Sequence, residues 1–183
     1  LRYRTCSYLL AVAMALAPAV GSAQKGGSVP ESLRGDAAPA NAVWLDSLDL
    51  LGVTQGYGEP QKRHSITNGP ISLKGMVFAH GVGAHAIFEA PFDLRGQAVR
   101  FVSAVGVDDA RTGQGSVRFH VYVDGRELAS TPVMHGGDTP RLLSVDLRGA
   151  KAMVLTADDA GDGIANDHAD WAGAYIEMRP GSS

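Results

Sequence analysis

The residues with the clearest capacity for chemistry lie in one acidic segment near the end of the chain. Between Asp158 and Asp170 the 183-residue sequence places five aspartates and one histidine. So many carboxylates in one loop repel each other unless a cation or hydrogen-bond donors compensate them. Oxygen ligands on a glycine-containing loop suit Ca²⁺. We therefore predict a structural calcium site that uses Asp159, Asp162 and Asp167.

Other interpretations of this segment stay open. An EF-hand does not fit, because counting from Asp158 puts alanine at the third and twelfth positions. A solvated turn, in which aspartates cap backbone N–H groups, needs no metal. His168 and Trp171 would also suit a sugar-contact pair, since a Trp ring packs on the C–H face of a pyranose and an imidazole bonds to hydroxyls. The competing interpretation places Trp171 in the core.

Two further polar groups interrupt or follow apolar runs. His85 lies in the glycine-containing segment 81–86, where it is either a structural histidine or a ligand contact. That segment lacks the third glycine and the helix of a dinucleotide fingerprint, so we do not expect nucleotide binding. Asp108 and Asp109 end an apolar run. Neighbours on a strand point apart, so we expect them to bind a ligand or the surrounding loops, and not to form a glycosidase carboxyl pair.

Short strands must position these groups. Residues 117–123 and 143–148 alternate between apolar and polar side chains, which is typical of half-buried strands. Asp124–Gly125 suits a tight hairpin turn. Turns separate further short apolar runs (71–78, 82–88, 99–107, 151–156 and 171–178). No long stretch has helical periodicity. We therefore predict an all-β fold, an antiparallel β-sandwich of the jelly-roll type.

Composition divides the chain into parts. Residues 1–23 have the basic start, apolar run and small residues of a signal peptide, so we expect an exported protein, periplasmic or secreted. Residues 24–41 are predicted to be a flexible linker, 42–179 the folded domain and 180–183 a tail. The net charge of −3 argues against nucleic acid as a partner. The sole cysteine, Cys6, lies in the predicted signal peptide, so we expect neither thiol catalysis nor a disulfide.

Several segments, in their order and spacing, resemble the NPCBM family of carbohydrate-binding modules over about residues 42–178. They are 44–48, 56–58, 81–86, 105–109, 115–119, 159–163 and 167–172. The resemblance implies a galactose-binding-like jelly roll without catalytic activity, of the kind attached to glycoside hydrolase family 98 and related secreted glycosidases. It also implies galactose-type ligands and a structural calcium ion. The residues assigned to carbohydrate binding are His85, Asp108, Asp109, His168, Trp171 and Tyr57.

Three positions depart from the family pattern. Tyr57 stands where the family usually has Trp, Leu51 lies near a second usual Trp, and Ile87 follows the His-Ala step where a small polar residue is frequent. We therefore keep a second hypothesis, a protein-interaction or envelope-structural module that has lost sugar binding, with an exported glycosidase or envelope protein as its partner. A small exported hydrolase ranks last, because no nucleophile motif occurs. A sugar site requires the acidic segment to meet His85 at one rim of the sandwich.

Overall fold

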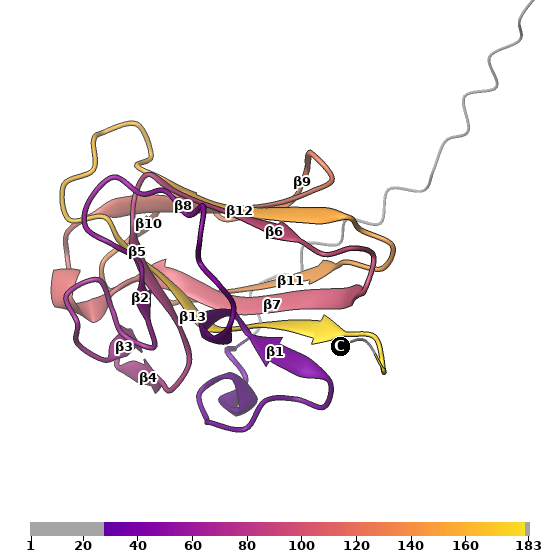
Figure 1. Cartoon of the computed structure of the whole chain (residues 1–183). Coiled ribbons are helices and arrows are strands. Elements are labelled where there is room, and N and C mark those ends of the chain that lie inside the picture. The colour runs from indigo at the N-terminus through magenta and orange to yellow at the C-terminus, as the bar shows by residue number, and fades with distance from the viewer. Residues whose placement is uncertain (1–27, 182–183) are drawn as a thin grey trace, which may run out of the picture.

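Two antiparallel sheets stacked face to face dominate residues 28–181, the part of the chain that the computed structural model describes (Figure 1). The signal peptide predicted at residues 1–23 lies outside this part. The first sheet has the strand order β11-β7-β13-β5-β2, with β1 paired to β13, and the second has the order β10-β8-β12-β6, with β9 paired to β8. The strand pairs described here are antiparallel, and the prediction of an all-β sandwich is confirmed.

The elements have the following bounds. The first sheet contains β1 (Ala42–Trp44), β2 (Gln61–Lys62), β5 (Gly81–His85), β7 (Ala98–Val107), β11 (Arg141–Asp146) and β13 (His168–Met178). The second contains β6 (Phe88–Asp93), β8 (Ser116–Val123), β9 (Arg126–Ser130), β10 (Met134–His135) and β12 (Ala152–Asp158). A separate hairpin joins β3 (Ile71–Leu73) to β4 (Met76–Phe78). Short 3-10 turns are η1 (Glu31–Leu33), η2 (Leu45–Ser47) and η3 (Asp109–Arg111).

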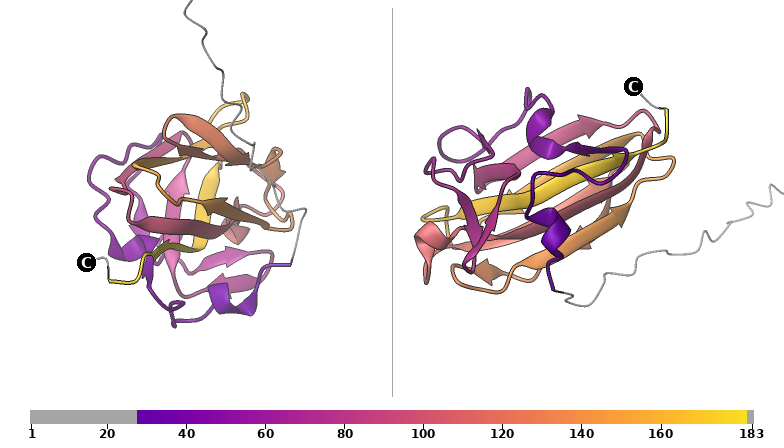
Figure 2. Two further views of the ribbon diagram at one scale, coloured as in Figure 1. Left: turned by 90° about the vertical axis from the view of Figure 1, so that its right-hand side faces the viewer. Right: turned by 90° about the horizontal axis from the view of Figure 1, so that it is seen from below.

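The main hydrophobic core lies between the two sheets. On β8 the alternation expected from the sequence is present, because Phe119 and Val121 are fully buried while His120 and Tyr122 lie on the outer face. Strand β13 runs through the middle of the first sheet, bonded to β5 on one side and β7 on the other, as Figure 2 shows. The alternation of β13 therefore decides which of its residues face the core and which face the β3–β4 hairpin.

A second apolar cluster lies on the other face of the first sheet, under the β3–β4 hairpin. It includes Ile71, Leu73 and Phe78 of the hairpin together with Leu33 of η1. Leu33 is 1% exposed, and the carbonyl oxygen of Arg34 accepts from the Ala79 N–H at 3.1 Å. The structure thus differs from the flexible linker expected at residues 24–41, because from residue 28 onward one apolar side chain fastens this segment to the domain.

Within residues 28–181, none of the helical segments has the length and apolarity that a membrane-spanning helix needs. The last two residues of the predicted tail, 182–183, lie outside the described residues.

Candidate functional site

Two histidines face each other across neighbouring strands at one end of the sandwich. His85 ends β5 and His168 begins β13, and the two are direct partners in the antiparallel register. Their ring centroids are 5.4 Å apart, with the ring planes tilted by 55°. The N–H of Ala86 donates to the carbonyl oxygen of Asp167 at 3.0 Å. The acidic segment therefore folds back against the strand that carries His85, as a sugar site requires.

Tyr57 adds an exposed aromatic ring beside His85. The two ring centroids are 5.4 Å apart, and Tyr57 is 67% exposed. Gln55 fixes the loop, because its Nε2 donates to the Tyr57 carbonyl at 2.7 Å and its Oε1 accepts from the His85 N–H at 3.3 Å. Gly56 must lack a side chain, since a Cβ there would collide with the carbonyl oxygen of Ala86. The loop thus holds an aromatic face in solvent next to an imidazole.

Arg111 supplies a cation that sequence reasoning missed. It ends η3, a turn whose N-cap is Asp108, and its Nε donates to His168 Nε2 at 3.1 Å. Because Nε2 accepts this bond, the His168 imidazole is neutral. Burial, followed by the Arg111 guanidinium, lowers the pKa of His168 to about 4. The sequence offered one cue, the place of Arg111 two residues after Asp109.

These four side chains, Tyr57, His85, Arg111 and His168, are called the histidine rim below. They come from four separate segments: the loop before β2, β5, η3 and β13. Figure 1 shows η3 and the long loop before β13 at the same end of the sandwich. The rim combines an aromatic face with imidazole and guanidinium nitrogens. An apolar sugar face packs on such a ring, and the nitrogens bond to hydroxyl groups.

Asp108 and Asp109, predicted to contact sugar, lie next to the rim but bind the protein itself. Asp108 is 2% exposed, and its Oδ2 accepts from the Ser72 N–H at 3.3 Å. Asp109 accepts from the Ser72 hydroxyl at 2.6 Å and from the N–H groups of Lys74 and Gly75, both at 2.7 Å. These bonds fasten the β3–β4 hairpin to η3. Both aspartates thus have a structural role, and a sugar contact by either of them stays a prediction.

Trp171, also assigned to sugar contact, is a core residue. It is fully buried between the sheets, with its ring centroid 5.2 Å from Phe119, 6.1 Å from Phe101 and 6.3 Å from Phe88. The assignment was wrong because Trp171 is three residues after His168. On an extended strand that spacing puts the two side chains on opposite faces.

A family model for the NPCBM/NEW2 domain matches residues 41–177. This chain belongs to the NPCBM family. It is 33% identical over 134 residues to the alpha-1,3-galactosidase B of Akkermansia muciniphila, a match that covers 71% of the chain. The match covers 17% of that protein, and a match to another curated relative covers 10%. The NPCBM domain thus corresponds to a small part of these relatives.

Solved structures similar to this NPCBM domain are modules of the type named CBM51. The CBM51 of a Clostridium perfringens GH95 protein, solved in complex with methyl-galactose, superposes with a TM-score of 0.71 at 31% identity, over 74% of this chain and 99% of that module. A second, CBM51-2 of Clostridium perfringens ZmpB with GlcNAc, gives a TM-score of 0.68 at 32% identity, over 75% of this chain and 31% of that one.

Of the three aspartates predicted to bind calcium, two share Ser116 as a partner in the NPCBM domain, and the third is bonded within its own turn. Both carboxyl oxygens of Asp162 accept from the Ser116 hydroxyl, at 2.7 and 2.6 Å, and Oδ1 of Asp167 accepts from the Ser116 N–H at 2.8 Å. Oδ1 of Asp159 accepts from the Gly161 N–H at 3.0 Å. Within residues 28–181, no three His, Cys, Asp or Glu side chains are grouped so that they would hold a metal ion. Calcium stays a prediction.

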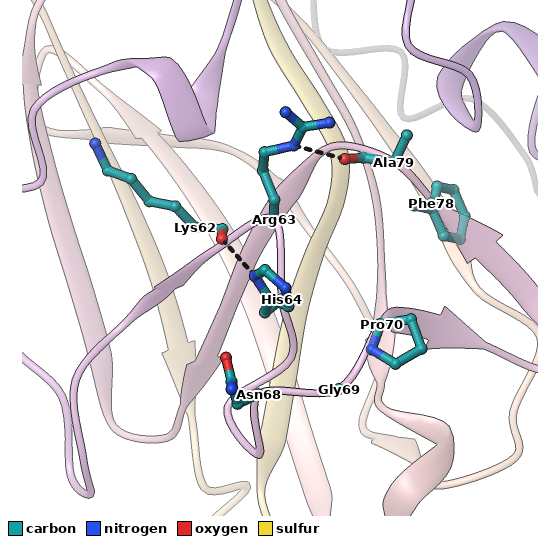
Figure 3. A pocket seen from close by; sticks show the side chains of 8 residues that line it. All are labelled: Lys62, Arg63, His64, Asn68, Gly69, Pro70, Phe78 and Ala79. Atoms are coloured by element: carbon teal, nitrogen blue, oxygen red, sulfur yellow. Dashed lines mark hydrogen bonds between the residues drawn. The ribbon is translucent and has the colours of Figure 1, made fainter.

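A separate pocket of about 590 Å³ opens beside β2 (Figure 3). Its lining contains none of the histidine rim residues: Lys62, Arg63, His64, Asn68, Gly69, Pro70, Phe78 and Ala79. Its cations are already engaged. Lys62 Nζ donates to the Leu48 carbonyl, and Arg63 donates to the Ala79 carbonyl and pairs with Asp36. We therefore place the candidate site at the histidine rim and not in this pocket.

Proposed function

We propose that this NPCBM domain is a non-catalytic module that binds a galactose-type sugar at the histidine rim. The observation that carries the proposal is the convergence of an exposed aromatic ring, Tyr57, with His85, His168 and Arg111 at one end of the sandwich. The apolar face of the sugar packs on Tyr57. The Arg111 guanidinium and Nε2 of His85 bond to its hydroxyls, and His168, whose Nε2 accepts from Arg111, orients the guanidinium.

Two observations support galactose-type sugars and the absence of catalysis. A CBM51 module whose whole length matches this fold was solved with methyl-galactose, and galactose is therefore the first ligand to test, with GlcNAc second. Glycoside hydrolysis uses two carboxyl groups that flank the sugar bond. Asp108 and Asp109, the acids beside the rim, are committed to backbone N–H groups and a serine hydroxyl.

Isothermal titration calorimetry on the intact domain tests the proposal. We expect methyl-galactoside to bind at a single site with a Kd of about 1 mM, which corresponds to about 4 kcal/mol. N-acetylgalactosamine and GlcNAc, titrated in parallel, rank the acetamido sugars against galactose. If none of these sugars binds and a glycan array is also silent, the proposal is wrong.

A second candidate function, a protein-interaction module, is favoured by exposed apolar side chains. Leu51 is 83% exposed, and Ile87, next in sequence to Ala86, is 56% exposed. Both side chains are therefore accessible to an apolar surface of a partner protein. Silent sugar titrations, together with purification of an exported protein bound to the domain, would select this function. Loss of that complex on mutation of Leu51 or Ile87 to Ser would locate the contact.

Two parts of the proposal concern the acidic loop and the start of the chain. For calcium, the supporting observation is Oδ2 of Asp167, a buried oxygen without a hydrogen-bond partner among the described residues. Export rests on the pattern of residues 1–23. N-terminal sequencing of the protein recovered from its host would decide whether this segment is cleaved, near Ala23.

A further inference from the structure

One buried carboxyl group near the histidine rim has no part in the contacts above. Asp170 lies two residues after His168 on β13, so both side chains are on the same face of the sheet. Asp170 is fully buried, and within the described residues neither of its carboxyl oxygens meets a hydrogen-bond donor. An ionised carboxylate in such a place is costly, so its protonation state needs an explanation.

The surroundings of Asp170 are built to enclose it. It is paired with Gly83 of β5 on one side and with Gly106 of β7 on the other. Leu73 of the β3–β4 hairpin covers Gly106, and the backbone of Ser65 covers Gly83, at distances that leave no room for a Cβ at Gly83. The two glycines allow these segments to close over the carboxyl group.

The charged groups that act most strongly on Asp170 are themselves carboxyls. Asp108 comes two residues after Gly106, the strand partner of Asp170, so its side chain is the diagonal neighbour of Asp170 on the same face of the sheet. Asp109 of η3 adds a second negative charge. Two histidines share this face, His168 on β13 and His85, which comes two residues after Gly83 on β5. The other groups that cover Asp170, from β7, the hairpin and the β2–β3 loop, are the uncharged ones named above. Burial, reinforced by these two carboxylates, raises the pKa of Asp170 well above its usual range.

Asp108 and Asp170 differ in what else they contact. Oδ1 of Asp108 accepts from the Ala110 N–H at 2.9 Å and Oδ2 accepts from the Ser72 N–H at 3.3 Å, so both oxygens act as acceptors. Asp170 has no such donor. A hydrogen bond between two carboxyl groups needs one proton. The proton belongs on the group whose negative charge nothing else stabilises.

We propose that Asp170 is a neutral carboxylic acid that donates a hydrogen bond to the Asp108 carboxylate, and that this bond is a positioning contact for Arg111. Asp108 is the N-cap of η3, and its carbonyl oxygen accepts from the Arg111 N–H at 2.9 Å. Two side-chain contacts thereby tie β13 to η3, Asp170–Asp108 and His168–Arg111, beside the backbone bond from the Asp108 N–H to the His168 carbonyl oxygen at 3.0 Å. The effect on sugar binding rests on the function proposed above, whereas the shared proton does not.

Stability measured against pH tests the shared proton without any sugar. Because the folded-state pKa of Asp170 is raised, its contribution to stability is complete below the unfolded-state pKa of about 3.9 and is lost as the pH rises toward the folded-state pKa. In D170N an amide N–H replaces the O–H donor. Relative to D170N, the folding equilibrium constant of the wild type should fall by up to about tenfold per pH unit above about pH 4. If the ratio of the wild-type folding equilibrium constant to that of D170N is constant or rises with pH, the proposal is wrong.

D146N is the matched control, because it also replaces a native carboxylate by an amide. Hydrogen bonds from Arg148 lower the pKa of Asp146 to about 2. Asp146 is therefore ionised in both the folded and the unfolded protein above about pH 5. The ratio of the wild-type folding equilibrium constant to that of D146N should be constant there. If D170N does not fold, ¹³C NMR of wild-type aspartate carboxyls replaces it. The assigned Asp170 carboxyl should titrate at a pH well above that of the exposed aspartates, and an Asp170 resonance that titrates together with them would contradict the proposal.

Titration with methyl-galactoside tests the positioning role. D170A should weaken binding by about tenfold, and D170N should restore most of the affinity, because its amide again donates to Asp108. If D170A does not fold, the pH profile decides: wild-type affinity should fall as Asp170 ionises, and that of D170N should not. Equal behaviour of the variants and the wild type would overturn the positioning role. If the wild type binds no sugar, the proposed function fails, and the stability curves still decide the shared proton.

Discussion

The Nε–H of Arg111 donates to Nε2 of His168 across 3.1 Å, joining two residues that are 57 positions apart in the chain. The contact orients a guanidinium from a short turn against an imidazole at the start of a central strand. Because the imidazole accepts this bond, one of its two nitrogens is fixed as an acceptor and its charge is zero. The contact therefore sets both the geometry and the charge of the proposed sugar site.

Removal of the Arg111 side chain should weaken sugar binding while the fold survives. We expect R111A to lower affinity for methyl-galactoside by about tenfold, or about 1.4 kcal/mol, because a hydrogen bond from a charged donor is lost. R111K should be intermediate, since lysine keeps the charge but not the planar fork. Calorimetric titration measures both. R148A, which removes an exposed arginine paired with Asp146, is the control, and a similar loss in that variant would contradict a specific role.

Tyr57 should contribute affinity and little stability. Its ring is two-thirds exposed, so Y57A should leave the melting temperature within about 2 °C of the wild type and weaken sugar binding by about tenfold. Y57F keeps the ring face and should bind like the wild type, apart from any hydrogen bond to the hydroxyl. Fluorescence melting and sugar titration on the three proteins check this. Full affinity in Y57A would exclude a stacking role.

Substitution at Gly56 should disturb the histidine rim through the backbone of the loop that carries Tyr57. A Cβ at this position would collide with the carbonyl oxygen of Ala86, so G56A must displace the loop that carries Tyr57. We expect a destabilisation of about 1–3 kcal/mol with a parallel loss of sugar affinity. G35A is the control, because a Cβ there meets nothing within 4 Å. Similar unfolding curves for G56A and G35A would show that the close approach is not required.

Trp171 should behave as a core residue in every measurement. W171A should cost about 3–5 kcal/mol of unfolding free energy, because it removes the largest side chain between the sheets. W171F should lower the unfolding free energy by less than W171A does. Folded W171F should bind sugar with an affinity within about twofold of the wild type. Denaturant unfolding and sugar titration separate the two effects. A selective loss of sugar binding in W171F, at unchanged stability, would restore the role first assigned to this residue.

Chelation tests the calcium prediction. If the acidic loop binds Ca²⁺, EDTA lowers the melting temperature and excess Ca²⁺ restores it. A ligand at about 100 times its Kd adds about 2.7 kcal/mol of stability. D162N, which keeps a partner for the Ser116 hydroxyl, should abolish the response. A melting curve that does not change with chelator would favour the alternative in which these aspartates serve as loop caps.

The sequence predicted those features that depend on local pattern. Alternation identified β8. The sugar-site hypothesis required the acidic segment to meet His85, and the strand register places His168 of that segment directly opposite His85. The features that were missed depend on a turn or on packing between distant segments. Arg111 reaches His168 only because η3 turns the chain back, and Leu33 is buried only because the hairpin and β13 leave a space above them.

Strand β13 joins three parts of the molecule that lie far apart in the chain. It supplies His168 to the rim, Asp170 to the enclosed acid site and Trp171 to the space between the sheets, and it enters between two strands made much earlier in the chain. A chain in which this last strand has not yet inserted therefore has half a binding surface and an open interior. If the histidine rim binds sugar as proposed, binding requires that β13 has docked, and time-resolved sugar binding during refolding would follow the docking of this strand.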